Sequence, residues 1–332
     1  MLQRIRIRNA LRTPLRADLR AEKSFITQQI IANFGGFLLG RTVNLHFLVI
    51  LAFLLLSSQL FVAEASCKHR FKRSYHFKEL AWGDENSWSD IDGDWIQDQE
   101  EKLSPCVLVA ISFFKGRVIA VGDEGFLSNV LIDEADNLKL GTNIINWLAQ
   151  ACGNNYRVLF DASHNELEDI DSNDPWLGYS KFAERLRGLG YTVEKNTRKI
   201  AWSTLRNYDV LVINAPNKSF LSNEIAAIIY FVLNGGGLFL MGEWHMSEHQ
   251  NVSQTLNPLA AFFGIKFNED TVCDLDDYWI EGPRYPIIRV FADHPVLKDV
   301  NEIYYYLGCS IEKAMKGFPE SGSSHLQKCR RG

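Results

Sequence analysis

The sequence lacks the short motifs that most often reveal a chemistry. It has no CxxC spacing, which argues against a zinc ribbon or a thioredoxin-type site. It also has no Walker motif and no dinucleotide-binding glycine fingerprint. Six cysteines are present, an even number that permits three disulfides in an exported chain but equally suits free buried thiols. They are Cys67, Cys106, Cys152, Cys273, Cys309 and Cys329.

Acidic residues outnumber basic ones outside the N-terminal region. Residues 1–41 carry eight Lys or Arg and two acidic residues, a net charge of +6. The remaining residues must therefore carry −11 to give the total of −5. A nucleic-acid binder needs a basic face that displaces counterions from phosphates, so the acidic body argues against nucleic acid as a partner.

The N-terminal region has the three parts of a secretory signal. A basic stretch precedes an apolar run at 47–56, and Ala63 and Ala65 form an Ala-x-Ala end. Ten helical residues reach only about 15 Å, half of a bilayer's hydrocarbon core. Residues 1–65 are therefore interpreted as a signal peptide, with an uncleaved N-terminal membrane anchor as the alternative. Both place the folded body outside the cytoplasm, as a secreted, periplasmic or cell-surface protein.

Residues 66–104 are polar and are interpreted as an acidic linker with a calcium loop, or as a small subdomain. The twelve residues 90–101 have the spacing of a calcium loop. Carboxylates occupy positions 1, 3, 5, 9 and 12 of this stretch, and position 7 offers a backbone carbonyl. The predicted calcium ligands are Asp90, Asp92, Asp94, Ile96, Asp98 and Glu101. Gly93 at position 4 and Trp95 at position 6 depart from an EF-hand, and the pattern more closely resembles the repeats of secreted thrombospondin-type linkers. The alternative is a solvated acidic linker without metal.

Strand and helix patterns alternate from Cys106 onward. Short apolar runs predict buried strands, and amphipathic segments between them predict helices. The strands are expected at 106–113, 117–121, 157–161, 209–214 and 237–241, and the helices at 139–149, 179–189, 223–233 and 255–263. This βαβ spacing predicts an α/β fold with a mostly parallel sheet and helices on both faces.

Residues 156–310 resemble the class I glutamine amidotransferase-like domains of uncharacterised exported proteins, which have relatives in gliding-motility and intraflagellar-transport proteins. The resemblance rests on ordered pieces that include Asp161-Ala162-Ser163-His164, 182–193, 209–216, 221–242 and 257–265. It implies a Rossmann-like or flavodoxin-like sheet.

The segment 115–148 looks like the part that normally closes such a domain, yet here it comes first. One interpretation is a circular order, in which a single domain spans 105–312, with 105–150 as its closing segment and 155–312 as its main body. The other is a tandem pair of shortened domains. A partial sheet would expose unpaired edges, which favours the single domain. Residues 313–332 are predicted to be disordered.

The expected catalytic turn carries no nucleophile. In the amidotransferases that this chain resembles, the strand matching 237–241 leads into a turn with a catalytic cysteine, whereas here the turn reads Gly242-Glu243-Trp244-His245. Glutamine hydrolysis is therefore not expected. Strand ends in such sheets converge on a crevice, so Asp161, His164, Glu243 and His245 are candidates for acid–base chemistry or metal binding. The alternative is that these groups cap helices and bind backbone.

These observations favour an exported, non-catalytic ligand-binding or scaffold protein with a calcium-stabilised linker. Its ligand would be a small molecule or a carbohydrate. One alternative is a hydrolase that acts on a small molecule, a sugar or a cell-wall component through the candidate crevice. A second alternative is an accessory subunit of a membrane transport or secretion complex, with a membrane-complex partner.

Overall fold

The computed structural model describes residues 75–150, 156–244, 252–280 and 282–314. The predicted signal peptide or anchor at 1–65 and residues 315–332 of the predicted tail lie outside the described residues and stay predictions. Within the described ranges, no helix combines the length and the apolar character needed to cross a membrane.

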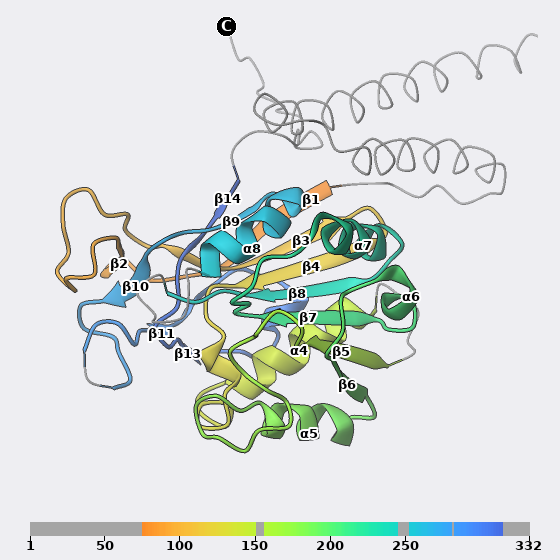
Figure 1. Ribbon diagram of the computed structural model, residues 1–332. Helices are drawn as coiled ribbons and strands as arrows, with labels where there is room; N and C mark the ends of the chain where they lie inside the picture. Colours follow the sequence, from red (N-terminus) through yellow and green to blue (C-terminus); the bar gives the residue numbers. More distant parts are fainter. Residues whose placement is uncertain (1–74, 151–155, 245–251, 281, 315–332) are drawn as a thin grey trace, which may run out of the picture. The chain divides into compact units, whose positions relative to one another are not determined.

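An eight-stranded sheet forms the body of the protein (Figure 1). From one edge to the other, its strands are β12 (Val290–Phe291), β1 (Tyr75–Trp82), β3 (Cys106–Phe113), β4 (Gly116–Val121), β8 (Gly237–Met241), β7 (Val210–Asn214), β5 (Arg157–Asp161) and β6 (Thr192–Asn196). The pairings from β4 to β6 are all parallel. The pairings β12–β1, β1–β3 and β3–β4 are antiparallel. The predicted α/β class and the mostly parallel sheet are confirmed, with an antiparallel extension at one side.

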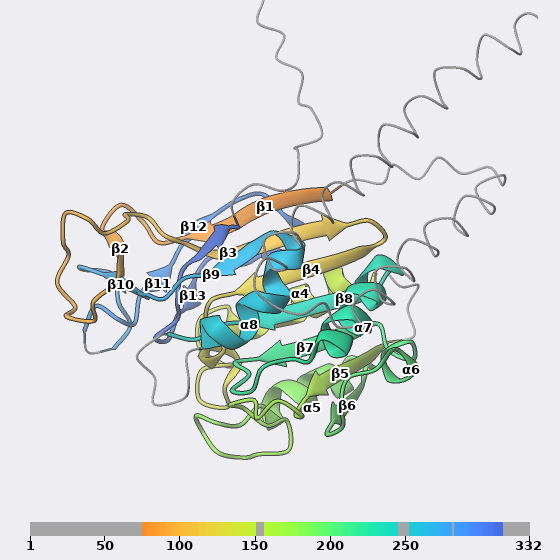
Figure 2. The same ribbon diagram turned by 45° about the horizontal axis from the view of Figure 1, so that its top comes forward.

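Helices cover both faces of this sheet (Figures 1 and 2). On one face, α4 (Asn137–Ala149) and α5 (Ser180–Gly188) bury apolar side chains such as Leu140 and Phe182. On the other face, α7 (Ser222–Leu233) and α8 (Val252–Ala260) do the same, and the short α6 (Trp202–Leu205) packs against α7. All five residues of β7 and of β8 are buried because both of their faces are covered.

The hairpin of β3 and β4 lies in the same sheet as the strands that follow it by 40 to 120 residues. Phe113 pairs with Gly116 at the turn, so the two predicted strands form a tight antiparallel hairpin. The strand β4 then pairs in parallel with β8, in a register that matches Arg117 with Gly237. A single apolar core on each face therefore includes residues from both parts of the chain.

The structure differs from the sequence prediction at residues 66–104, part of which is not a linker. The strand β1 pairs with β3 over most of its length, and β2 (Ser87–Asp90) pairs with β10 (Thr271–Asp274). Neither strand is strongly apolar, and β2 finds its partner about 180 residues away. Local periodicity cannot reveal such pairings, because the burial comes from the distant partner.

Short elements complete the described residues. Two further two-stranded sheets pair β11 (Ile287–Ile288) with β13 (Ile303–Tyr304), and β14 (Ile311–Lys313) with β9 (Ile265–Phe267). Three 3₁₀ turns are η1 (Gly125–Leu127), η2 (Ala261–Phe263) and η3 (Pro295–Leu297). Figure 1 shows β2, β10, β11 and β13 gathered at the end of the main sheet that lies opposite α6. Because α6 precedes β7, this is the end at which the parallel strands finish.

Gly122 allows the end of β4 to pack closely against the segment around Cys309. Cys309 donates its backbone N–H to the Gly122 carbonyl at 2.8 Å, and a Cβ on Gly122 would lie 1.9 Å from the Cys309 carbonyl oxygen. We expect Gly122→Ala to lower the free energy of unfolding by about 2–3 kcal/mol through overpacking. Gly188→Ala, where nothing lies within 4 Å of the added Cβ, should raise it by up to about 1 kcal/mol. Urea unfolding measures both, and equal stability of the two variants would contradict this packing.

Candidate functional site

Polar side chains collect where the parallel strands end. Asp161 is the last residue of β5, and Asn214 is the last residue of β7. Asp123 and Glu243 come two residues after β4 and β8. Parallel strands finish at one edge of a sheet, where α/β proteins build their binding sites. The structure sorts these side chains into two separate clusters, and a group of aromatic rings lies beside the second.

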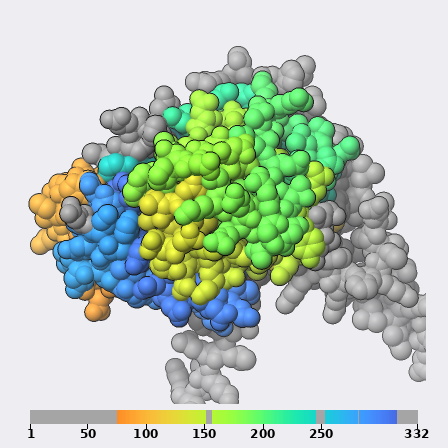
Figure 3. All heavy atoms as spheres, turned by 90° about the horizontal axis from the view of Figure 1, so that it is seen from below, coloured from red at the N-terminus to blue at the C-terminus, as the bar shows by residue number. Residues whose placement is uncertain are grey.

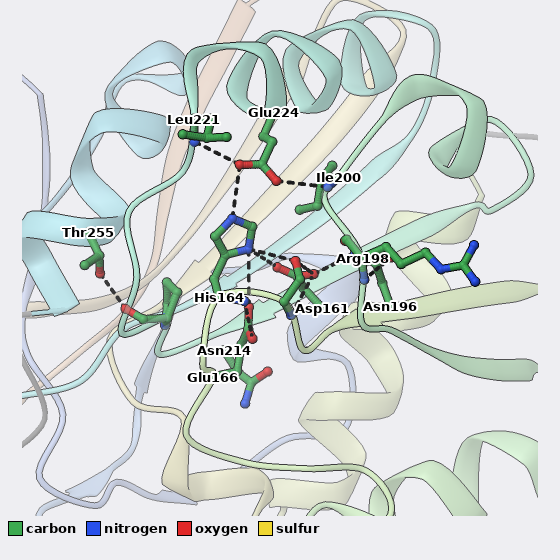
Figure 4. A network of polar contacts seen from close by, with 12 residues as sticks. Asp161, His164, Glu166, Asn196, Arg198, Ile200, Asn214, Leu221, Glu224 and Thr255 are labelled. Carbon is green, nitrogen blue, oxygen red and sulfur yellow. Dashed lines mark hydrogen bonds and ion pairs between the residues drawn. The ribbon is translucent and has the colours of Figure 1, made fainter.

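His164 is the centre of the first cluster (Figure 4). Its Nδ1 lies 2.6 Å from Asp161 Oδ2, and its Nε2 lies 3.4 Å from Glu224 Oε2. Asn196 Nδ2 and Ser163 Oγ each donate to Asp161 Oδ1 at 2.8 Å. Glu224 also accepts from the backbone N–H groups of Ile200 and Leu221, at 3.0 and 2.9 Å. The network therefore joins the ends of β5 and β6 to the start of α7.

The pKa values in this cluster favour an imidazolium between carboxylates. Burial lowers the pKa of His164, but the bonds and charges of Asp161 and Glu224 outweigh burial and raise it. Burial raises the pKa of Asp161, yet hydrogen bonds from His164, Glu166 and Asn196 bring it below its ordinary value. Burial and the adjacent Asp161 raise the pKa of Glu166 to about 9, which favours the protonated form of Glu166 at neutral pH.

This arrangement supports a structural role better than a catalytic one. A general base needs a free nitrogen within reach of a substrate proton, whereas both His164 nitrogens face carboxylates and the residue is buried. Asp161, His164 and Glu166 each place one ligand atom within 4.8 Å of the others, a spacing that a metal could use. His164 would first have to break its contact with Asp161. The cluster forms a buried cross-link in this structure, and the hypothesis of acid–base chemistry at Asp161 and His164 stays a prediction.

Of the other two candidate residues, Glu243 belongs to the second cluster, and His245 lies outside the described residues, so its role stays a prediction. The buried carboxyl cluster consists of Asp123, Glu124, Glu168 and Glu243, whose exposed fractions are 0, 3, 5 and 6%. Burial raises the pKa values of Asp123 and Glu243 to about 8. Burial and neighbouring carboxyls also raise those of Glu124 and Glu168 well above the ordinary value.

Hydrogen bonds connect this buried carboxyl cluster internally. Glu124 lies within hydrogen-bonding reach of both Glu243 and Glu168. Asn214 donates its side-chain N–H to Glu168 Oε2 at 2.9 Å. A contact between two carboxyl groups requires a proton or a cation between them, because two carboxylates repel each other.

Beside the carboxyl cluster lies a continuous group of aromatic rings, which we call the aromatic surface. It comprises Trp95, Trp176, Trp244, Trp279, Tyr285, Tyr304 and Tyr306, with Arg284 among them. Tyr306 stacks between Trp176 and Tyr285, with ring centroids 4.9 and 5.2 Å apart. The Arg284 guanidinium lies 4.8 Å from the Trp95 ring and 5.1 Å from the Tyr285 ring.

The aromatic surface draws on four distant parts of the chain, at Trp95, Trp176, Trp244 and 279–306. Figure 3 shows the yellow-green segment that contains Trp176 and the blue segments around 275–306 beside the yellow residues that follow β4. Trp176 is 42% exposed, and the other six rings are half-buried. Tyr306 connects this surface to the carboxyl cluster, because its backbone N–H donates to Asp123 Oδ2 at 2.8 Å.

The acidic loop forms a compact turn. Asp90 is buried and accepts from the N–H groups of Gly93 and Trp95, at 2.8 and 3.3 Å. Glu101 closes the loop by accepting from Ile91 and Asp98, at 3.0 and 2.9 Å. Carboxylate oxygens of Asp90, Asp92 and Asp94 lie within 4.8 Å of one another, which a cation could use. The described cysteines Cys106, Cys273 and Cys309 are free and buried.

Sequence reasoning missed most of both clusters. Asp123 and Glu124 follow directly on the predicted strand 117–121, so the strand-end rule that selected Asp161 would have selected them. Glu168 and Glu224 gave no such signal. Glu168 sits in the long connection after β5, and Glu224 looks like an ordinary acidic residue in the first turn of α7.

Replacing His164 tests the cross-link. His164→Ala leaves Asp161 and Glu224 buried without their shared partner, so we expect a loss of about 3–5 kcal/mol in the free energy of unfolding. Lys266→Ala is the control, because it breaks the exposed pair between Lys266 and Glu312 and should cost less than about 1 kcal/mol.

The stability lost in His164→Ala relative to wild type should depend on pH. The raised pKa of His164 gives a contribution that is full below about 6.5 and is lost as the pH rises through the folded-state pKa. The lowered pKa of Asp161 gives a contribution that is present above about 3.8 and is lost as the pH falls through the folded-state value. The stability difference between wild type and His164→Ala, measured by urea unfolding from pH 3 to 9, should therefore peak between about pH 4 and 6.5. A difference that does not vary with pH would show that His164 is not an imidazolium in the folded state.

Comparison with known proteins supplies the family. The family model described as "ABC-type uncharacterized transport system" matches residues 155–323. An uncharacterized protein of Aquifex aeolicus (strain VF5) is 32% identical over 148 residues, which are 44% of this chain and 58% of that protein. The chain thus spans little more than half the length of this curated relative.

Similar solved structures include the mmIFT52 N-terminal domain, with a TM-score of 0.39, 18% identity and coverage of 47% of this chain and 73% of that one. The IMPa metallopeptidase from Pseudomonas aeruginosa gives a TM-score of 0.31, 16% identity and coverage of 56% and 19%. At these scores the likeness carries no functional information. The family model, by contrast, spans about half of the chain and includes the buried histidine cross-link, and the protein belongs to the ABC-type uncharacterized transport system family.

Proposed function

We propose that the protein is a non-catalytic accessory subunit of a membrane transport complex and that it binds its partner outside the cytoplasm. The observation that carries this proposal is the aromatic surface. Tyrosine, tryptophan and arginine are the residues that dominate binding energy at protein interfaces. Here they form one continuous group at the sheet edge where α/β proteins place their sites.

Two further observations support a binding role. The turn that carries the nucleophile in the amidotransferases that the chain resembles reads Gly242-Glu243-Trp244-His245 here, without Cys or Ser, and its Glu243 is buried, which raises the pKa of that carboxyl. His164, the described histidine at the crevice, has both ring nitrogens engaged. The family is that of a transport system, and the signal-like pattern at 1–65 supports an extracytoplasmic location.

The test is an affinity purification. The tagged full chain is isolated from detergent-extracted membranes of its native host, and the transport subunits that are recovered with it are measured. We expect the wild-type chain to retain ATP-binding and permease subunits in stoichiometric amounts. Trp176→Ala/Arg284→Ala should lower their recovery at least tenfold, because hot-spot truncations cost about 2 kcal/mol or more.

Trp202→Ala is the matched control, since Trp202 is also exposed but lies on α6, at the opposite end of the main sheet. Its recovery of partners should equal that of wild type. Recovery of the wild-type chain without transport subunits would refute the transport role. Equal recovery with all three proteins would refute the aromatic surface as the contact.

We also propose that the acidic loop binds calcium, which would stiffen the segment between β2 and β3. The clustered oxygens of Asp90, Asp92 and Asp94, together with Asp98 and Glu101 nearby in the loop, suit a hard cation that takes six to eight oxygens.

Calcium titration into chelator-treated protein tests the loop by calorimetry and thermal unfolding. The wild type should bind calcium and melt at a higher temperature with it. Asp92→Asn/Asp94→Asn should lose this binding event, because two ligand charges are removed without a change in shape. Calcium binding that is identical in the two proteins would place the ion elsewhere.

Finally, we infer that residues 105–150 are the displaced closing segment of a flavodoxin-like domain. If β4 is counted as the last parallel strand instead of the first, the order β6-β5-β7-β8-β4 becomes 2-1-3-4-5, which is the flavodoxin-like order. The parallel pairing of β4 with β8 supports this circular order over a tandem pair of shortened domains.

A further inference from the structure

A second group of exposed large side chains lies at the end of the main sheet where the parallel strands begin. The segments that lead into β4, β5, β6 and β7 each present one such side chain to solvent. These are Phe114, Tyr156, Leu189 and Trp202, with exposed fractions of 37, 46, 55 and 36%. Neighbouring strands lie about 4.8 Å apart, so the four side chains extend along this edge of the sheet over about 20 Å. Together with Lys115 and Arg206, they form what we call the basal surface.

The two ends of the parallel strands differ in charge. The segments that follow β4 and β5, residues 122–136 and 162–179, contain five Asp or Glu each and no Lys or Arg. The described segments that lead into the parallel strands are 114–115, 156, 189–191, 201–209 and 234–236.

These leading segments carry two exposed basic residues, Lys115 and Arg206, and a single acidic residue, Asp209. Asp209 is 1% exposed and accepts the backbone N–H of Arg157 at 2.9 Å. Glu194, on the neighbouring strand β6, is paired with the Arg157 guanidinium at 2.8 Å. The basal surface therefore combines exposed aromatic rings with basic side chains on an otherwise acidic body.

The N-terminal part of the chain joins the fold at the same end. Figures 1 and 2 show that β1 starts at the end of the sheet where α6 lies, and Tyr75 at its start pairs with Phe113 beside the β3–β4 turn. The apolar run at 47–56 precedes Tyr75 by the 18 residues 57–74. A chain held in a bilayer by this run would be tethered at the end that carries the basal surface.

We propose that the basal surface lies against a lipid bilayer that carries anionic headgroups. Tryptophan and tyrosine are enriched at membrane–water interfaces, where one part of the ring system is apolar and the other is hydrated. Exposed Leu and Phe side chains can enter the headgroup region, and Lys and Arg attract anionic lipids. The acidic segments at 122–136 and 162–179 lie at the opposite end, where such headgroups would not repel them.

This contact goes beyond the transport role and does not rest on it. It leaves the aromatic surface, at the opposite end of the parallel strands, directed away from the lipid. Trp202→Ala remains a valid control for partner recovery, because it removes one of the four apolar contacts and keeps both basic side chains.

Hydroxyl-radical footprinting with mass spectrometry tests the contact on the full chain as isolated from its native host. The protein is combined with vesicles of phosphatidylcholine, either alone or with about 30% phosphatidylglycerol. Phe114 and Trp202 should be oxidised about threefold more slowly on the anionic vesicles, because bound headgroups cover them. About 0.5 M NaCl should remove the difference by screening the attraction. Trp176, which is 42% exposed at the opposite end, is the internal control and should react equally on both.

Charge reversal tests the basic side chains. Lys115→Glu/Arg206→Glu should abolish the protection of Trp202 on anionic vesicles, because both charges that attract the headgroups become repulsive. Lys181→Glu/Lys218→Glu is the matched control, since it reverses two exposed charges at the opposite end of the parallel strands and should behave like wild type. If the first variant fails to fold, Arg206→Glu alone should weaken the protection in the same direction.

Two results would overturn the proposal. One is equal oxidation of Trp202 on the two kinds of vesicle. The other is undiminished protection of Trp202 in the folded charge-reversal variant. Either result would mean that the basal surface faces solvent or a protein. Because the test contains lipid and no transport subunit, its outcome is separate from that of the partner recovery.

Discussion

The parallel pairing of β4 with β8 is the contact on which the rest of the structure depends. It joins residues 106–149 to residues 157–241 in one sheet and gives each face of that sheet a continuous core. Without it, both parts would have an unpaired strand edge and an uncovered apolar face. The same pairing places Asp123 and Glu124 beside Glu243, so the buried carboxyl cluster is a direct consequence of this register.

The two polar clusters at this sheet edge differ in how their charges are balanced. Around His164, the ring nitrogens contact Asp161 and Glu224, whose presence raises the pKa of the imidazole, and neighbouring amide and hydroxyl groups complete the hydrogen bonds. Around Glu124, four carboxyl groups are buried together, and burial raises the pKa of each of them. The first cluster joins β5, β6 and α7, whereas the second is stabilised by protons on its carboxyl groups.

Sequence patterns anticipated the central strands and helices but not the periphery. The runs at 106–113, 157–161 and 237–241 became β3, β5 and β8 with the expected bounds, because a strand buried on both faces must be apolar throughout. The strands β1 and β2 were missed because their burial is supplied by β3 and β10 and not by their own composition. Asp161 and His164 were correctly paired, since they are three residues apart at a strand end. Their partner Glu224 is 60 residues away, and its role emerges only when α7 packs on the sheet.

The local sequence therefore determined the class of fold, the apolar strands and the compact acidic loop. It also places no Cys or Ser in the turn at 242–245, which follows β8. These features follow from neighbours in the chain, whose spacing sets the periodicity of burial and the geometry of turns. Tertiary structure alone decided which strand ends meet. It separated Glu243 from His164, united Glu243 with Glu124 and Glu168, and brought Trp95, Trp176 and Tyr306 into one surface. The physical reason is that these contacts depend on strand order and helix packing, which the free energy of the whole core selects and no single segment encodes.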